Sequence, residues 1–170
     1  GGTVTMSTGS GTTKTGGALI IKTAHSGSAG TSGLMIFSSG TTTSGNSGAI
    51  SVGTGAATKG KGGDLRVTVG DGKSGIGGQL SLSAGLNTDV TGGAVTMYTG
   101  SGTTKSSGAL IIKTAHSGSA GTSGLMIFSS GTTTSGNSGT ISIGTGAATK
   151  GKGGDVRITV GDGKSGIGGQ

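Results

Sequence analysis

The sequence predicts an all-β protein, a β-solenoid of about eleven coils, each of length 15 or 16. Three observations lead to this prediction: a long repeat with a period of 91, a glycine that returns at every 15th or 16th position, and apolar residues at alternate positions after that glycine. Each coil of a solenoid stacks on its neighbours, so the fold needs a regular repeat more than a large core. We therefore expect one continuous solenoid over residues 1–170.

The long repeat relates residues 1–79 to residues 92–170. The two segments align at an offset of 91 and differ at eight of 79 positions. The super-repeat is thus 1–91, followed by an incomplete second copy, 92–170. We expect the chain to be a fragment of a longer array.

A shorter period lies inside the long one, and a glycine marks the first position of each short unit. Five spacings of 15 and one of 16 add up to the long period of 91. Low-complexity tracts do not keep such a register. The marking glycines are Gly2, Gly17, Gly33, Gly48, Gly63, Gly78, Gly93, Gly108, Gly124, Gly139, Gly154 and Gly169.

The strand of each unit is predicted from positions 3 and 5, which are apolar and alternate with other residues, as in a strand with one buried face. Val52 and Val67 are replaced only by isoleucine in the second copy, whereas Ser7 is replaced by the bulky Tyr98 at an outward position. We therefore expect positions 3 and 5 to form an inward core ladder. Its members in the first copy are Val4, Met6, Leu19, Ile21, Met35, Phe37, Ile50, Val52, Leu65, Val67, Leu80 and Leu82.

The first turn of each coil is predicted at position 8, which is glycine in five of the first six units and gives the backbone freedom for a tight turn. A shorter return segment of small residues and a second turn would complete the coil. Lys14 and Lys73 do not suit an inward position there, because burying an unpaired ammonium group is costly. The predicted turn glycines are Gly9, Gly40, Gly55, Gly70 and Gly85.

Composition excludes several classes of protein. Gly, Ser and Thr make up more than half of the chain, and the absence of cysteine excludes a disulfide scaffold, a cysteine zinc cluster and a thiol nucleophile. His25 and His116 have no second ligand at metal-binding spacing, and only five carboxylates are present. We expect no enzyme, no cofactor and no metal site. No apolar run approaches the roughly 18–20 residues of a membrane span.

Charge and exposed apolar residues indicate which partners suit the chain. The net charge is +7, but a nucleic-acid partner is not expected, because no Arg cluster and no exposed stacking platform are present. Apolar residues at outward positions 2 and 4 are either ordinary exposed aliphatics or a lateral contact with a second solenoid, repeated about every 29 Å. They are Ile20, Leu34, Ile36, Ile111, Leu125 and Ile127.

The stretch 62–70, Gly-Gly-Asp-Leu-Arg-Val-Thr-Val-Gly, resembles the Gly/Ser/Thr-rich β-solenoid repeat proteins of extracellular fibres and cell-surface adhesins. The resemblance covers the whole chain. It implies an extracellular fibrous or adhesive role, and it carries over no catalytic residue.

The leading functional hypothesis is a structural protein that forms or stiffens an extracellular filament, appendage or wall layer, with lateral or head-to-tail self-assembly. The alternative is an adhesin stalk or binding module for anionic polysaccharide or mineral surfaces. Ice binding is a third hypothesis, which the charged outward residues Lys22, Asp64 and Arg66 disfavour because they interrupt any regular threonine array.

Overall fold

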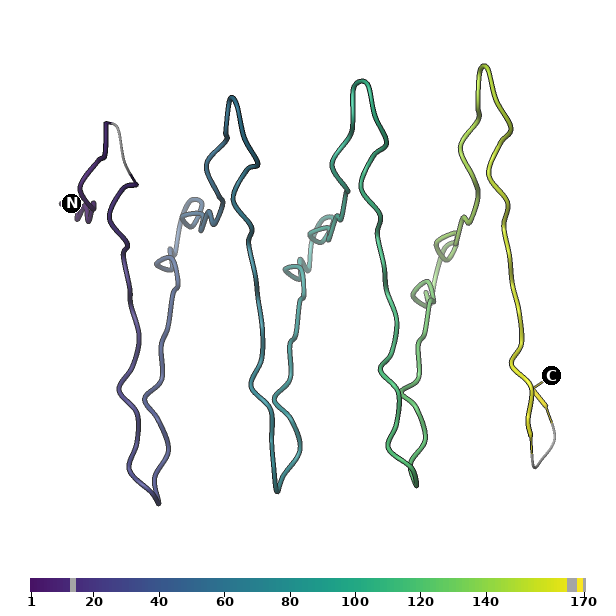
Figure 1. The fold of residues 1–170 in the computed structure, drawn as a ribbon, viewed down its shortest axis with the longest axis horizontal. Helices are drawn as coiled ribbons and strands as arrows, with labels where there is room; N and C mark the ends of the chain where they lie inside the picture. Colours follow the sequence, from purple (N-terminus) through teal and green to yellow (C-terminus); the bar gives the residue numbers. More distant parts are fainter. Residues whose placement is uncertain (13–14, 165–167, 170) are drawn as a thin grey trace. The chain divides into compact units, whose positions relative to one another are not determined.

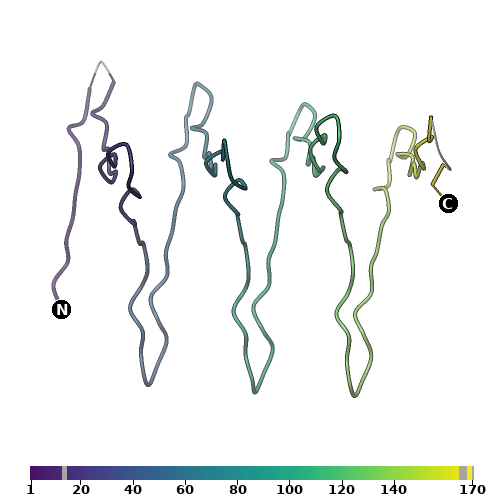
Figure 2. The ribbon, with the colours of Figure 1, turned by 90° about the horizontal axis from the view of Figure 1, so that it is seen from below.

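The computed structural model describes residues 1–12, 15–164 and 168–169, and it shows extended segments joined by bends (Figures 1 and 2). None of the described residues lies in a helix or in a strand. The prediction of an all-β solenoid is therefore wrong. Over the described ranges the chain is an irregular coil in which the bends recur at regular intervals.

The chain divides into two units, Gly1–Leu82 and Ser83–Gln170. The same local features recur in both units, so each unit can be described in the register of the short repeat. Whether the chain is one continuous array stays a prediction.

The bends follow the sequence repeat. In each short unit of length 15 the described bend begins at the eleventh position, as at 43–45, 58–60 and 73–75, and in the longer unit it begins at the twelfth, at 28–30. The extra residue therefore lies ahead of the bend. The second unit of the chain repeats this pattern at 88–90, 103–105, 119–121, 134–136 and 149–151.

Short polar side chains hold several bends. The Ser26 hydroxyl donates to the Gly30 carbonyl at 2.9 Å, and the Thr42 hydroxyl donates to the Ser44 carbonyl at 3.2 Å. Such local side-chain bonds favour turns over helices and ladders. The abundance of Ser and Thr thus stabilises the bends without adding to a core.

Chain reversals are closed by single backbone hydrogen bonds. The Gly17 N–H donates to the Gly9 carbonyl at 3.1 Å in the first unit of the chain, and the Gly93 N–H donates to the Gly85 carbonyl at 2.9 Å in the second. A sheet needs a ladder of such bonds between neighbouring segments. The described residues form only five backbone–backbone hydrogen bonds, whereas a folded chain has roughly one hydrogen bond per residue.

No described residue is buried, so the predicted core is missing over the described ranges. The chain exposes 17035 Å², whereas a folded monomer of 15.6 kDa exposes about 7,300 Å². Thr23, Ser26, Ser39 and Ser130 are half-buried, and all are small and polar. The large apolar side chains lie in contact with solvent.

Candidate interaction surfaces

A recurring contact closes the loop between consecutive short units, and we call it the neck. At each neck the side chain at position 7 of one unit lies against the glycine at position 1 of the next. A Cβ atom placed on these glycines would lie 2.5–3.6 Å from the position-7 side chain. The pairs are Thr8–Gly17, Thr23–Gly33, Ser39–Gly48, Thr54–Gly63, Val69–Gly78, Ala84–Gly93, Thr99–Gly108, Thr114–Gly124, Ser130–Gly139, Thr145–Gly154 and Val160–Gly169.

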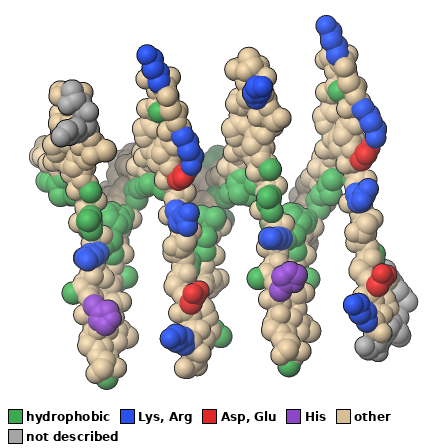
Figure 3. Space-filling view, in the orientation of Figure 1, with side chains coloured by type: hydrophobic (Ala, Val, Ile, Leu, Met, Phe, Trp, Pro, Cys, Tyr) green, Lys and Arg blue, Asp and Glu red, His purple; other side chains and the backbone are tan. Residues whose placement is uncertain are grey.

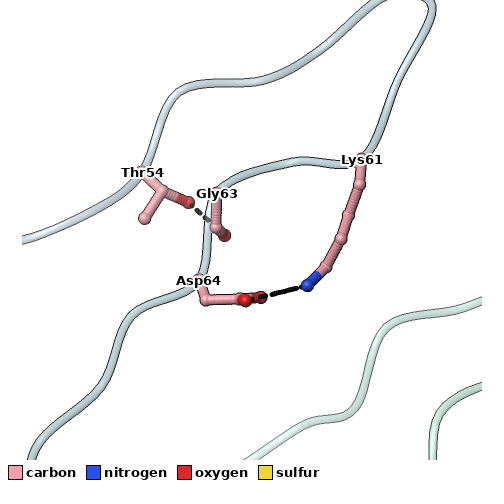
Figure 4. Close-up of polar contacts among 4 residues, drawn as sticks. All are labelled: Thr54, Lys61, Gly63 and Asp64. Atoms are coloured by element: carbon pink, nitrogen blue, oxygen red, sulfur yellow. Dashed lines mark hydrogen bonds and ion pairs between the residues drawn. The ribbon is translucent and has the colours of Figure 1, made fainter.

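Threonine adds a hydrogen bond to the neck in two places. The Thr54 hydroxyl donates to the Gly63 carbonyl at 3.0 Å (Figure 4), and the Thr8 hydroxyl donates to the Gly17 carbonyl at 2.9 Å. Valine makes the tightest neck, since Val69 Cγ1 would lie 2.5 Å from a Cβ on Gly78. A Cβ atom would therefore clash most severely at the two necks that contain valine, at Gly78 and Gly169.

An ion pair lies beside the neck at Gly63. The Lys61 ammonium lies 2.7 Å and 2.8 Å from the two carboxylate oxygens of Asp64 (Figure 4). Lys152 and Asp155 form the equivalent pair in the second copy at 3.1 Å. Both pairs are largely exposed, so each contributes at most about 1 kcal/mol to stability.

The predicted core ladder lies on the surface. Its exposed fractions run from 40% at Met35 to 89% at Val4, and Figure 3 shows hydrophobic side chains lying open to solvent. We refer to the apolar side chains at positions 3 and 5 of the short units as the apolar rows; they are exposed and form no core over the described ranges. The affected residues are Val4, Met6, Leu19, Ile21, Met35, Phe37, Ile50, Val52, Leu65, Val67, Leu80 and Leu82.

In the segment 19–21 the exposed fractions alternate between the two sides of the chain. Leu19 and Ile21 are 57% and 51% exposed, whereas Ile20 between them is 75% exposed. Leu110, Ile111 and Ile112 repeat this pattern in the second copy. Positions 3 and 5 are thus the more sheltered side in this segment, although nothing covers them.

The six outward apolar residues are all strongly exposed, between 71% and 83%. They are accessible to a partner, but a lateral contact stays a prediction. The residues are Ile20, Leu34, Ile36, Ile111, Leu125 and Ile127.

The predicted turn glycines lie just ahead of the bends. None of them has a positive φ; among the described residues only Gly45 and Gly136 do, both at +117° and both at position 13. Position 8 instead supplies neck carbonyls, with acceptors at Gly9, Gly70 and Gly85. Gly40 and Gly55 have open space where a side chain would stand.

Over the described ranges, no pocket is present and no cluster of His, Cys, Asp or Glu could hold a metal ion. The candidate sites are therefore open surfaces. No described helix has the length and the apolar character needed to span a membrane.

Comparisons with known proteins add no family: no family model, no curated protein and no solved structure matches the chain. The resemblance to repeat proteins of fibres and adhesins therefore stays a prediction.

The sequence contains a recognisable pattern for two features that were not predicted from it, the neck and the ion pairs. Position 1 is always glycine while position 7 is always Thr, Ser, Ala or Val, which is the signature of the neck. Lys61 and Asp64 stand three positions apart with opposite charges, as do Lys152 and Asp155.

Proposed function

We propose that the chain is a structural protein that assembles with further copies of itself into an extracellular filament, appendage or wall layer. The observation that supports this proposal best is the regular row of apolar side chains that the single chain leaves exposed. Contiguous exposed apolar surface on a soluble protein usually marks an interaction site. A partner that covers such rows must itself repeat with the period of the short unit.

A second copy of the chain meets that requirement. It carries the same rows at the same spacing, and the two super-repeats of one chain already present them twice. Two repeating surfaces match at many contacts at once, so weak single contacts add to a strong association. Assembly through copies also extends without limit when the contact is head-to-tail.

Unpaired backbone groups provide a second driving force. The described residues use few of their backbone N–H and C=O groups in internal bonds. Extended segments with free backbone groups are templates for pairing with another chain. No proline interrupts these donors anywhere in the 170 residues.

Sedimentation of matched variants tests the proposal. Leu80→Ser with Leu82→Ser removes two members of an apolar row, whereas Ile76→Ser with Leu86→Ser removes two exposed apolar residues outside the rows. Each buried leucine contributes about 1.5–3 kcal/mol, so the row variant should raise the assembly concentration at least about tenfold.

The variant with Ile76→Ser and Leu86→Ser serves as the control and should assemble like the natural chain. Equal effects of the two variants would show that general hydrophobicity, and not the rows, drives association. A natural chain that remains monomeric at high concentration would overturn the proposal.

A further inference from the structure

We propose that the two basic segments 59–66 and 150–157 are binding sites for a linear polysaccharide that bears carboxylate or sulfate groups. Each segment holds two lysines, one arginine and one aspartate, a net charge of +2 in a short stretch. All of these side chains are exposed. This inference is separate from self-assembly, because it concerns the charged side chains of each segment and not the apolar side chains at positions 3 and 5.

The structure places the cations of each segment on the two sides of one neck. Lys59 lies in the bend 58–60, Lys61 precedes Gly63, and Arg66 follows it on the extended segment. The contact between Thr54 and Gly63 holds the loop closed at that point. Figure 3 shows Lys and Arg side chains gathered beside an Asp on the surface. Each segment therefore carries exposed cations both before and after the neck glycine.

The ion pair gives the site an internal competitor. A carboxylate oxygen of Asp64 lies 2.7 Å from the Lys61 ammonium, and a carboxylate oxygen of Asp155 lies 3.1 Å from the Lys152 ammonium. Both partners are exposed, so an external carboxylate or sulfate can replace the aspartate at little cost. Arg66 and Arg157 have no such pair among the described residues, and a guanidinium binds these anions in a bidentate manner.

A polymer fits this surface better than a small ion does. The described residues form no pocket that would enclose a free anion. A long ligand can contact several cations of one open segment, and each contact after the first is then intramolecular. The two segments recur at an offset of 91 with every charged residue retained.

A polysaccharide also fits better than a nucleic acid. Single-stranded nucleic acids are held by aromatic side chains as well as by cations. The three aromatic residues Phe37, Tyr98 and Phe128 all lie outside both basic segments. The segments thus offer charge without base stacking.

The test measures retention of the full chain, residues 1–170, on dextran sulfate, polygalacturonate, neutral dextran and single-stranded DNA. We expect binding to at least one charged polysaccharide, none to neutral dextran, and release at about 1 M salt, where charges are screened beyond about 3 Å. A preference between the two charged polymers identifies sulfate or carboxylate as the recognised group. Tighter binding to the DNA would overturn the assignment.

Matched variants separate local sites from net charge. The site variant carries Lys→Ser at Lys59, Lys61, Lys150 and Lys152, and the control variant carries Lys→Ser at Lys22, Lys73, Lys105 and Lys113. Each variant loses four positive charges. We expect the site variant to bind at least about tenfold more weakly and the control less than about threefold. Equal losses would overturn the proposal.

Removal of the internal competitor gives the opposite change. Asp64→Asn with Asp155→Asn frees two lysines, whereas Asp71→Asn with Asp162→Asn adds the same charge outside the segments. We expect the first variant to bind about two- to fivefold more tightly than the second. Indistinguishable affinities would show that the ion pairs do not restrain the site.

Discussion

A glycine at position 1 is the residue on which each neck depends. At several necks the position-7 side chain leaves little room for a Cβ atom, and the approach is closest against Gly78 and Gly169. Here the need for glycine is steric, because none of the position-1 glycines has a positive φ. Composition alone predicts flexible glycine, whereas the contact shows glycine as the small partner in a packed pair.

Gly78→Ala should open its neck. The new Cβ would lie 2.5 Å from Val69 Cγ1. Overpacking costs about 1–3 kcal/mol, and the single backbone bond that closes the reversal contributes roughly 0.5–1.5 kcal/mol, so a clash beyond the lower end of its range outweighs the bond. Nuclear Overhauser contacts between residues 69 and 78 should therefore disappear in this variant.

Two further variants complete that experiment. Gly77→Ala has open space around the new methyl group, so it should keep the contacts between residues 69 and 78. Val69→Ala added to Gly78→Ala removes the clashing methyl group and should restore them, because a Cβ at residue 78 would lie 3.9 Å from the Cβ of residue 69. Persistence of the contacts in Gly78→Ala alone would disprove the steric explanation.

At the scale of the bend, hydrogen bonds to side-chain oxygen atoms fix the backbone, which forms no ladder of hydrogen bonds between segments over the described ranges. The Asn87 side-chain oxygen accepts from the backbone N–H groups of Asp89 and Val90, both at 2.8 Å. This arrangement fixes the bend 88–90 through local contacts alone. A bend of this kind forms without help from neighbouring units.

Asn87→Ala should loosen the bend 88–90. The change removes two hydrogen bonds, each of which contributes about 0.5–1.5 kcal/mol. Amide exchange at Asp89 and Val90 should become several times faster, while exchange at the bend 103–105 stays unchanged. Asn46→Ala is the matched control, since the Asn46 side chain forms no hydrogen bond with a described residue. Unaltered exchange in Asn87→Ala would refute this role.

The elements also show how far the sequence could predict the fold. The short repeat depends on residues that are near one another in the sequence, so the bends recur with the period of that repeat. The alternation of exposure at Leu19, Ile20 and Ile21 also agrees with the apolar pattern. Pairing between segments is not local. The same alternation is compatible with packing against the next coil, with packing against another chain, and with a segment that packs against neither. The single chain realises no ladder over its described ranges, and this is why the solenoid prediction failed.

The candidate sites are predictable to a similar extent. The sequence places Leu34 at an outward position and the side chain is 83% exposed, whereas the lateral contact at such positions stays a prediction. It assigns Met35 and Phe37 to a core because it assumes a covering coil that the described residues do not provide. The Lys61–Asp64 pair is missed, because a net charge does not show which side chains of opposite sign lie beside each other.

At the scale of the whole molecule, composition and exposure agree. Gly, Ser and Thr contribute more than half of the residues and supply bends and necks, whereas the 28% of hydrophobic residues largely face solvent. Fixing a backbone costs about 1–2 kcal/mol per residue, and burial normally offsets that cost. A chain with no buried residue over its described ranges does not offset that cost within itself, and under the proposed function further copies of the chain supply the missing burial.

Hydrogen exchange of the same protein as a dilute monomer and as a sedimented assembly tests this account most directly. We expect fast exchange along most of the dilute chain, since its described residues form few backbone hydrogen bonds. In the assembly, protection should appear at positions 2–8 of each short unit and recur with the period of that unit. Strong protection in the dilute monomer, or the same exchange in both samples, would contradict the claim that the rows become covered only on assembly.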